Sequence, residues 1–228
     1  MTTYFVSGTD TDCGKTLVTT GLLRLAAQNG LETVGLKPIA AGCEVNDGVY
    51  HNADALMIQQ AMTAPLDYQD VNPVALLPPI APHIAAAEIG MTVTISQLRA
   101  LLQPGLSYPA DLILVEGAGG WLVPLNDSEF LTDLAGVLQM PIILVVGMKL
   151  GCLNHALLTQ ARIEQAGLVV AGWVANQVDP MMSRPAENLA TLQQHMHGQF
   201  LGYIPHLKGD DDTERALDAV AYLKLPPL

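Results

Sequence analysis

Apolar residues in this chain form short, nearly continuous runs that alternate with longer segments in which they recur every three or four positions. Such runs are typical of strands buried on both faces, and the helical spacing predicts helices with one buried side. The predicted strands are residues 3–7, 31–38, 111–116, 141–146, 168–176 and 200–205, with a short extended piece at 71–76. The predicted helices are residues 17–27, 51–62, 93–102, 127–138, 156–166, 185–197 and 213–223. The alternation predicts an α/β fold with a doubly wound, mostly parallel sheet.

The first predicted strand runs into the loop Gly8-Thr9-Asp10-Thr11-Asp12-Cys13-Gly14-Lys15-Thr16 and then into a helix. Phosphate oxygens need several donors at once, and the free N–H groups and positive dipole end of a helix N-terminus supply them. This context predicts a phosphate-binding loop of the P-loop NTPase type. Lys15 would reach the β- and γ-phosphates, and the Thr16 hydroxyl would hold Mg²⁺. Gly8 stands one residue earlier than in the usual pattern, and the alternative is a chance Gly-Lys-Thr sequence.

Composition limits the kinds of partner that this chain can have. Its 228 residues suffice for one α/β domain, and no linker, repeat or low-complexity segment divides residues 1–228. No apolar run reaches the ~18 residues of a membrane span, and no export signal is visible. The three cysteines are scattered and odd in number, which suits a reducing cytoplasm. A net charge of −12 argues against a nucleic-acid partner. We therefore expect a soluble, cytoplasmic protein.

Charged residues stand at the ends of predicted strands, where ligands bind in an open parallel sheet. Lys37 ends the second strand and Glu116 ends a later one, so both are expected beside the first loop. The placement of Lys15, Lys37 and Lys149 suggests that the cations of this acidic chain gather around one site for an anionic ligand. Glu116 is a candidate Mg²⁺ ligand, and Asp54 is either a second ligand or, like Asn52, a helix cap. A solvated lysine and a chance acidic strand end are the alternatives.

A second glycine loop, Gly147 to His155, also leads from a predicted strand into a helix. Free N–H groups near Gly151 and Cys152 predict a second anion site there. The alternative is an ordinary turn in which Asn154 caps the helix. Farther along the chain, Asn176 ends a strand at a place where its amide could read the edge of a base.

The first loop resembles the GTxTxxGKT loop of the dethiobiotin synthase family, including its early glycine. The blocks LKPIAAG, NADAL, NPVALxxPxxPHIAA, LVEGAGGWLVPL, VVGMKLGCLNHALLT and GWVAN follow in the family's order. The resemblance covers nearly the whole chain. It implies a parallel α/β P-loop fold and a homodimer with each active site at the subunit interface.

The resemblance implies roles for individual residues. Catalysis would depend on Lys15 and Lys37, and Mg²⁺ would be held by Thr16, Asp54 and Glu116. Contacts with ATP are implied for Asp12, Cys13, Gly14, Lys15, Thr16, Leu17, Asp54, Glu116, Gly117, Ala118, Gly119, Asn176, Gln177, Pro205, His206, Leu207 and Asp212. Contacts with the substrate 7,8-diaminopelargonate are implied for Thr11, Lys37, Ala41, Gly151, Cys152 and Asn154. The last three would receive its carboxylate from the neighbouring subunit. Ala41 replaces a serine common in relatives, and residues 208–212 match only loosely.

The implied reaction joins CO₂ to one substrate amine as a carbamate, activates it with the γ-phosphoryl group of ATP, and closes a ureido ring with the second amine. No protein nucleophile is required, so lysines and Mg²⁺ that neutralise charge suit this chemistry. The main alternative is a partitioning-type switch ATPase, whose loop carries a lysine where this chain has Asp10. Another ATP-dependent amidoligase and a small-molecule kinase are further alternatives.

Overall fold

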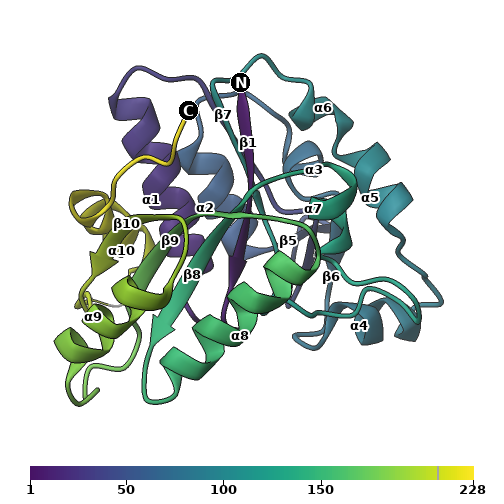
Figure 1. The fold of residues 1–228 in the computed structure, drawn as a ribbon. Coiled ribbons are helices and arrows are strands. Elements are labelled where there is room, and N and C mark those ends of the chain that lie inside the picture. Colours follow the sequence, from purple (N-terminus) through teal and green to yellow (C-terminus); the bar gives the residue numbers. More distant parts are fainter. Residues whose placement is uncertain (210) are drawn as a thin grey trace.

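The computed structural model describes residues 1–209 and 211–228 and is built around a six-stranded sheet (Figure 1). In spatial order the strands are β10 (Gln199–Ile204), β9 (Val170–Gln177), β8 (Ile142–Met148), β1 (Thr2–Gly8), β7 (Leu112–Glu116) and β2 (Thr33–Leu36). Neighbouring strands pair in parallel throughout this sheet. The predicted doubly wound parallel sheet is therefore confirmed. Asp210, in the loosely matching segment, lies outside the described residues.

Helices cover both faces of the sheet (Figure 1). One face packs against α1 (Lys15–Gln28), α2 (Ala53–Ala61) and α10 (Asp212–Ala219), which is followed by a 3₁₀ turn, Val220–Tyr222. The other face packs against α5 (Ile95–Leu101), α7 (Asp133–Val137), α8 (Cys152–Gln165) and α9 (Pro185–His195). The short helices α3 (Tyr68–Val71), α4 (Pro82–Glu88) and α6 (Gln103–Leu106) lie in the connections.

Strand β8 shows why the strands read as continuous apolar runs. Ile142, Leu144 and Val146 belong to the core on the α8 side, whereas Ile143 and Val145 belong to the core on the α1 side. All five are fully buried. Burial of each such side chain contributes about 1.5–3 kcal/mol, so both faces of the strand stabilise the sheet.

Residues 44–51 form a β-hairpin. Strands β4 (Glu44–Asn46) and β5 (Val49–His51) pair antiparallel around Asp47 and Gly48, which have φ values of 51° and 79°. A two-residue turn with positive φ matches the twist of the paired strands, which explains the hairpin. A second small sheet pairs β3 (Ile39–Ala41) with β6 (Val74–Leu76) in parallel, at the predicted extended piece.

The predicted helix 127–138 is only partly correct, because helix α7 covers Asp133–Val137 alone. The Asn126 side-chain oxygen accepts hydrogen bonds from the backbone N–H groups of Ser128 and Glu129, both at 3.0 Å. An asparagine that bonds to the following backbone in this way favours a turn over a helix. Within the described ranges, no helix is long and apolar enough to cross a membrane.

Candidate active site

The loop between β1 and α1 is closely packed against its surroundings. Gly14 caps α1 with a left-handed backbone (φ 90°), and a Cβ there would collide with the side-chain nitrogen of Asn176. At Gly8, a Cβ would collide with the buried Cys13 sulfur. Only glycine fits these two positions without rearrangement, which gives the early glycine a physical reason. Cys13 thus lies beneath the loop, and its buried thiol has a raised pKa because of desolvation.

Asp10 ties this loop together. Its carboxylate accepts from the Thr11 backbone N–H at 2.9 Å and pairs with the Lys149 ammonium at 2.7 Å. Its carbonyl oxygen accepts from the Lys15 ammonium at 3.2 Å. Lys149 therefore follows β8 as expected but is engaged by the loop, and it does not line the cavity described below. Asp10, which stands where the partitioning proteins carry a lysine, is therefore paired with Lys149.

Lys37 lies at the centre of a charged cluster at the ends of β2 and β7. Its ammonium is 2.6 Å from Glu116 Oε1 and 3.1 Å from Asp54 Oδ2. The Thr16 hydroxyl donates to the same Glu116 oxygen at 2.8 Å. The Lys37 side chain is 4% exposed and Glu116 is 0% exposed, whereas Asp54 is 47% exposed. The four predicted residues, two from strand ends and two from helix starts, therefore meet.

Charge pairing outweighs burial at this cluster. Burial alone would lower the pKa of Lys37, but the charges of Glu116 and Asp54, with their hydrogen bonds, raise it above the ordinary value. Burial would raise the pKa of the Asp54 carboxyl, yet the charge and hydrogen bond of Lys37 lower it below the ordinary value. Lys37 is therefore a cation and Asp54 an anion at neutral pH.

The residues proposed for Mg²⁺ fit such an ion. The second carboxylate oxygen of Glu116, Oε2, is buried and has no hydrogen-bond partner among the described residues. A buried oxygen of this kind needs a partner, and a hard cation or its bound water would supply one. Thr16 adds a hydroxyl and Asp54 a carboxylate, and both supply hard oxygen atoms of the kind that Mg²⁺ prefers. Asn52, and not Asp54, caps α2, by accepting from the Ala55 backbone N–H at 3.2 Å.

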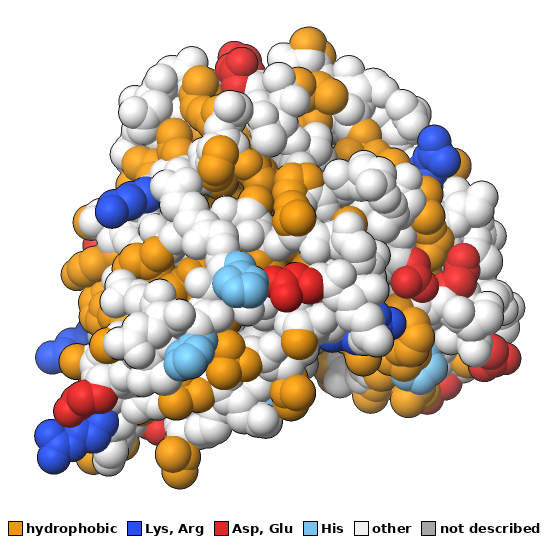
Figure 2. Space-filling view, viewed as in Figure 1, with side chains coloured by type: hydrophobic (Ala, Val, Ile, Leu, Met, Phe, Trp, Pro, Cys, Tyr) orange, Lys and Arg blue, Asp and Glu red, His pale blue; other side chains and the backbone are white. Residues whose placement is uncertain are grey.

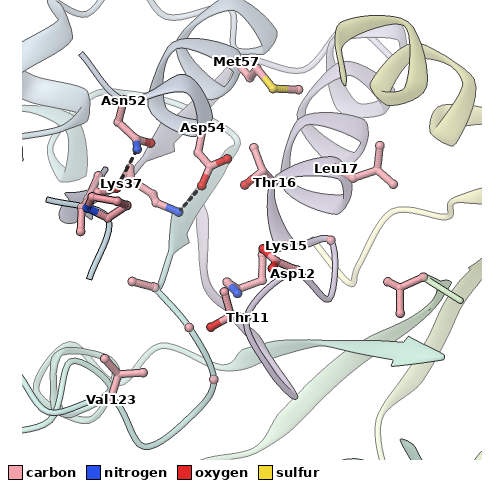
Figure 3. Close-up of a pocket in the computed structure, with 18 of the residues that line it drawn as sticks. Thr11, Asp12, Lys15, Thr16, Leu17, Lys37, Asn52, Asp54, Met57 and Val123 are labelled. Atoms are coloured by element: carbon pink, nitrogen blue, oxygen red, sulfur yellow. Dashed lines mark hydrogen bonds and ion pairs between the residues drawn. The ribbon is translucent and has the colours of Figure 1, made fainter. Parts of the chain in front are cut away.

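A cavity of about 1110 Å³ opens over the first loop (Figure 3). Lys15 from the start of α1 and Lys37 from the end of β2 both line it, with Asp54 across from Lys37 (Figure 3). Other predicted residues that line it are Thr11, Asp12, Gly14, Thr16, Leu17, Ala41, Ala118, Gly119, Asn176, Gln177, His206, Leu207 and Asp212. Predicted residues that do not line it are Cys13, Glu116, Gly117, Pro205, Gly151, Cys152 and Asn154. Glu116 lies just behind Lys37 and Thr16.

Sequence reasoning missed part of the lining of this cavity. Asn52, Met57 and Arg215 line it, as do residues 79–82 and 122–124. The prolines of the first of these segments were visible in the sequence but indicated only a loop. An apolar wall beside a charged cluster suits a ligand with a polar head and an apolar chain.

Asn176, which was predicted to read a base edge, and Gln177 line the cavity, with Asn176 against the first loop. The Asn176 amide nitrogen donates to the Cys13 carbonyl at 3.0 Å, so its oxygen is the atom left to accept from a ligand. Gln177 accepts from the Tyr203 hydroxyl at 2.5 Å and donates to the Asp179 carbonyl at 3.3 Å. Through its bond to Cys13, the Asn176 amide also holds the first loop in place.

The second glycine loop lies outside this cavity. Helix α8 begins at Cys152 with Gly151 as its N-cap in a left-handed conformation (φ 94°). Asn154 lies within the first turn, so it is not the cap that the alternative interpretation required. Leu150, just before the helix, is 95% exposed. The first turn of α8 therefore does not line the cavity of its own chain.

A parallel sheet with a glycine loop at the start of α1, and with Glu116 and Lys37 at the ends of the neighbouring strands β7 and β2, defines a P-loop nucleotide-binding protein. Solved structures agree on the fold. The MinC:MinD cell division complex of Aquifex aeolicus has a TM-score of 0.58 at 14% identity, covering 97% of this chain and 88% of that one. MinD of Pyrococcus horikoshii with Mg-ADP has a TM-score of 0.54 at 17% identity, covering 98% and 87%.

The family follows from sequence relatives. A family model described as an AAA domain matches residues 2–212. ATP-dependent dethiobiotin synthetases from Chromohalobacter salexigens and Cellvibrio japonicus are each 49% identical to this chain. Both alignments cover 99% of this chain, and they cover 99% of the first enzyme and 96% of the second. The enzyme of the same name from Pseudomonas aeruginosa is 47% identical, covering 100% of this chain and 98% of its own. The chain therefore belongs to the ATP-dependent dethiobiotin synthetase family, which consists of ligases of biotin biosynthesis.

Proposed function

We propose that this protein converts 7,8-diaminopelargonate, CO₂ and ATP to dethiobiotin, ADP and phosphate. The observation that carries the proposal is the convergence of Lys15 and Lys37 on one cavity that also has an apolar wall. Family membership supplies the substrate class. The cavity volume of about 1110 Å³ is ample for a nucleotide and a second small molecule together.

In this proposal the backbone N–H groups of the first loop and Lys15 hold the ATP phosphates, and Thr16 holds Mg²⁺ with Asp54 and Glu116. Bound Mg²⁺ would neutralise charge on the phosphates during transfer. The ion pairs of Lys37 keep its ammonium charged and oriented toward the cavity. Lys37 would then stabilise the anionic carbamate and the transferring phosphoryl group.

Bond changes in the proposed reaction balance without a protein nucleophile. The amine nitrogen bonds to the carbon of CO₂ and loses a proton, which leaves a carbamate. A carbamate oxygen attacks the γ-phosphorus and ADP leaves, giving a carbamic-phosphoric anhydride. The second amine attacks the carbamoyl carbon, phosphate leaves with that oxygen, and a proton is lost as the ring closes. The protein's part is to position the amines and to exclude water.

We assign nucleotide contacts at the other end of the cavity to Asn176, Gln177 and Asp212, with the segment 205–207. The free oxygen of the Asn176 amide could accept from the exocyclic amine of adenine, a group that guanine presents as a carbonyl at the same position. Arg215 pairs with Asp212 and would orient that carboxylate. This end of the cavity is therefore suited to ATP.

We further propose a homodimer in which the N-terminus of α8, with Gly151, Cys152 and Asn154, binds the substrate carboxylate of the partner's site. In support, this helix end does not line its own cavity and Leu150 beside it is almost fully exposed. A shallow cleft of about 280 Å³ near α7 and α8 exposes Leu122, Phe130 and Val137. Figure 2 shows abundant apolar side chains and few lysines or arginines on the face that α7 and α8 occupy in Figure 1. Such surfaces are typical of subunit contacts.

The partitioning-type ATPase is the alternative that shares the fold. Structural likeness at 14–17% identity supports only the fold, whereas the 47–49% identity over whole chains supports a synthetase. Where the partitioning proteins carry their signature lysine, this chain has Asp10, which pairs with Lys149.

A cytoplasmic location, where ATP is available, suits three cysteines that are all free and buried.

Oxygen transfer tests the proposed mechanism. If a carbamate oxygen attacks the γ-phosphorus, brief incubation with ¹⁸O-labelled bicarbonate should place one label in the released phosphate. Mass spectrometry of the phosphate measures the transfer. Dethiobiotin formed with unlabelled phosphate would rule out the anhydride while leaving the overall reaction in place.

A further inference from the structure

A largely buried polar network joins the backbone of Lys37 to the end of α3. Strand β2 ends at Leu36 and a proline follows Lys37, so the backbone of Lys37 has left the main sheet. Its N–H donates to the Val71 carbonyl at 2.7 Å, and its carbonyl accepts from the Asn72 amide nitrogen at 2.7 Å. Asn72 is 3% exposed. Both backbone groups of Lys37 are therefore held by the end of α3.

The same network reaches the helix that carries Asp54. The Asn72 side-chain oxygen accepts from the Tyr68 hydroxyl at 3.0 Å, and that hydroxyl accepts from the Asn52 backbone N–H at 2.8 Å. Asn52 caps α2 and also donates from its amide to the Ala41 carbonyl at 3.2 Å. Tyr68 and Asn72 thus connect the end of β2 with the start of α2, two residues before Asp54.

We infer that Asn72 is a positioning residue that sets where Lys37 points, and that Tyr68 extends this control to Asp54. The 3.1 Å contact between Lys37 and Asp54 joins two segments whose backbones meet through Asn72 and Tyr68. The inference rests on the catalytic role of Lys37 in the proposed function.

Asparagine suits position 72 because both ends of its amide are used. The nitrogen donates to the Lys37 carbonyl while the oxygen accepts from Tyr68. A carboxylate has no donor, and an alanine has neither group. Loss of the donor leaves the buried Lys37 carbonyl without this partner, so the segment shifts to find another. Displacement of a catalytic group by about 1 Å can reduce turnover by about 100-fold.

The test compares Asn72→Ala and Tyr68→Phe with Gln160→Ala as a matched control. Gln160 is also a buried amide, 5% exposed, that bridges two backbone groups. It donates to the His195 carbonyl at 3.3 Å and accepts from the His197 N–H at 2.6 Å, between α8 and the end of α9. Gln160 lines neither the cavity over the first loop nor the cleft near α7 and α8. Its replacement by alanine should therefore lower Tm without changing the geometry of the active site.

We expect Asn72→Ala to lower kcat for dethiobiotin formation by about tenfold or more, with KM for ATP within about twofold of wild type. Tyr68→Phe, which keeps the Asn72–Lys37 bond, should lower kcat by less. Gln160→Ala should lower Tm while kcat stays near the wild-type value. In a Lys37→Gln background, Asn72→Ala should cost much less of the remaining kcat, because the group that it positions is absent.

Wild-type kcat for folded Asn72→Ala and Tyr68→Phe would overturn the inference, as would an equal fractional loss in both Lys37 backgrounds. If Asn72→Ala does not fold, Tyr68→Phe decides, because an unchanged kcat in that variant alone contradicts the link to Asp54. Wild-type protein assayed alongside separates the two levels of the argument. A wild type that makes no dethiobiotin contradicts the proposed function, whereas an active wild type with indifferent variants contradicts only the positioning role.

Discussion

Two carboxylates offset the positive charge of Lys37. Its ammonium pairs with Glu116 and Asp54, so a phosphate or carbamate must compete with these partners or share the cation with them. If Mg²⁺ binds the carboxylates as proposed, Lys37 would lose part of this pairing and become available to the reacting anion. In the proposed mechanism the cluster would then link metal binding to the availability of the lysine.

Replacement of Lys37 tests that role at the scale of one residue. Lys37→Gln should lower kcat by about 100-fold or more, since one preorganised donor at a developing charge is worth that much. Lys224→Gln, which removes an exposed lysine near the C-terminus, is the matched control and should retain wild-type kcat. Turnover of Lys37→Gln within a few-fold of wild type would remove Lys37 from the reacting centre.

Glu116 is predicted to make the rate depend on Mg²⁺ through its unpartnered oxygen. Glu116→Gln keeps the size of the side chain but removes its charge, so the Mg²⁺ concentration for half-maximal rate should rise by about tenfold or more. A titration of initial rate against Mg²⁺, after removal of metal with a chelator, measures the shift. An unchanged titration would show that Glu116 does not contribute to metal binding.

At the scale of elements, the two ends of α1 differ in what their glycines must do. Gly14 and Gly30 both have positive φ, at 90° and 77°, but a Cβ at Gly14 collides with Asn176 and one at Gly30 meets nothing within 4 Å. Gly14→Ala should therefore weaken ATP binding by at least about tenfold, since it moves the loop. Gly30→Ala should cost about 1–2 kcal/mol of stability with unchanged ATP affinity. Isothermal titration calorimetry and thermal unfolding separate the outcomes, and equal ATP affinities would refute the argument.

The Asp10–Lys149 pair joins the first loop to the end of β8 and gives a pH prediction. The hydrogen bond with Lys149 lowers the pKa of Asp10, and the reciprocal bond raises the pKa of Lys149. The stability that Asp10 contributes through its lowered pKa is present above about pH 3.8 and is lost below it. The stability that Lys149 contributes through its raised pKa is lost above about pH 10.5. Asp10→Asn should thus lower stability by at most about 1 kcal/mol, evenly from pH 5 to 9, because both side chains are over one-third exposed. A Tm difference that varies across this range would contradict the assignment.

Helices and strands were predictable from the sequence where the local hydrophobic pattern matches the faces that are buried in the fold. The strands of the main sheet were found because both faces are buried, and Lys37 and Glu116 were found because they end two of these strands. Helix 127–138 was overpredicted because Asn126 bonds to the following backbone. The role of Asn72 could not be predicted, since its bond to the Lys37 carbonyl spans 35 positions and depends on how α3 meets β2.

For the whole molecule, one sheet brings a phosphate-binding loop, a charged cluster and an apolar wall to a single cavity, which supports synthesis of dethiobiotin. The most direct test incubates the purified protein with 7,8-diaminopelargonate, Mg-ATP and ¹³C-bicarbonate, and measures all products by mass spectrometry. We predict ¹³C-labelled dethiobiotin in amounts equal to ADP and phosphate. ADP formed without the ring product, or a phosphorylated diaminopelargonate, would contradict this account.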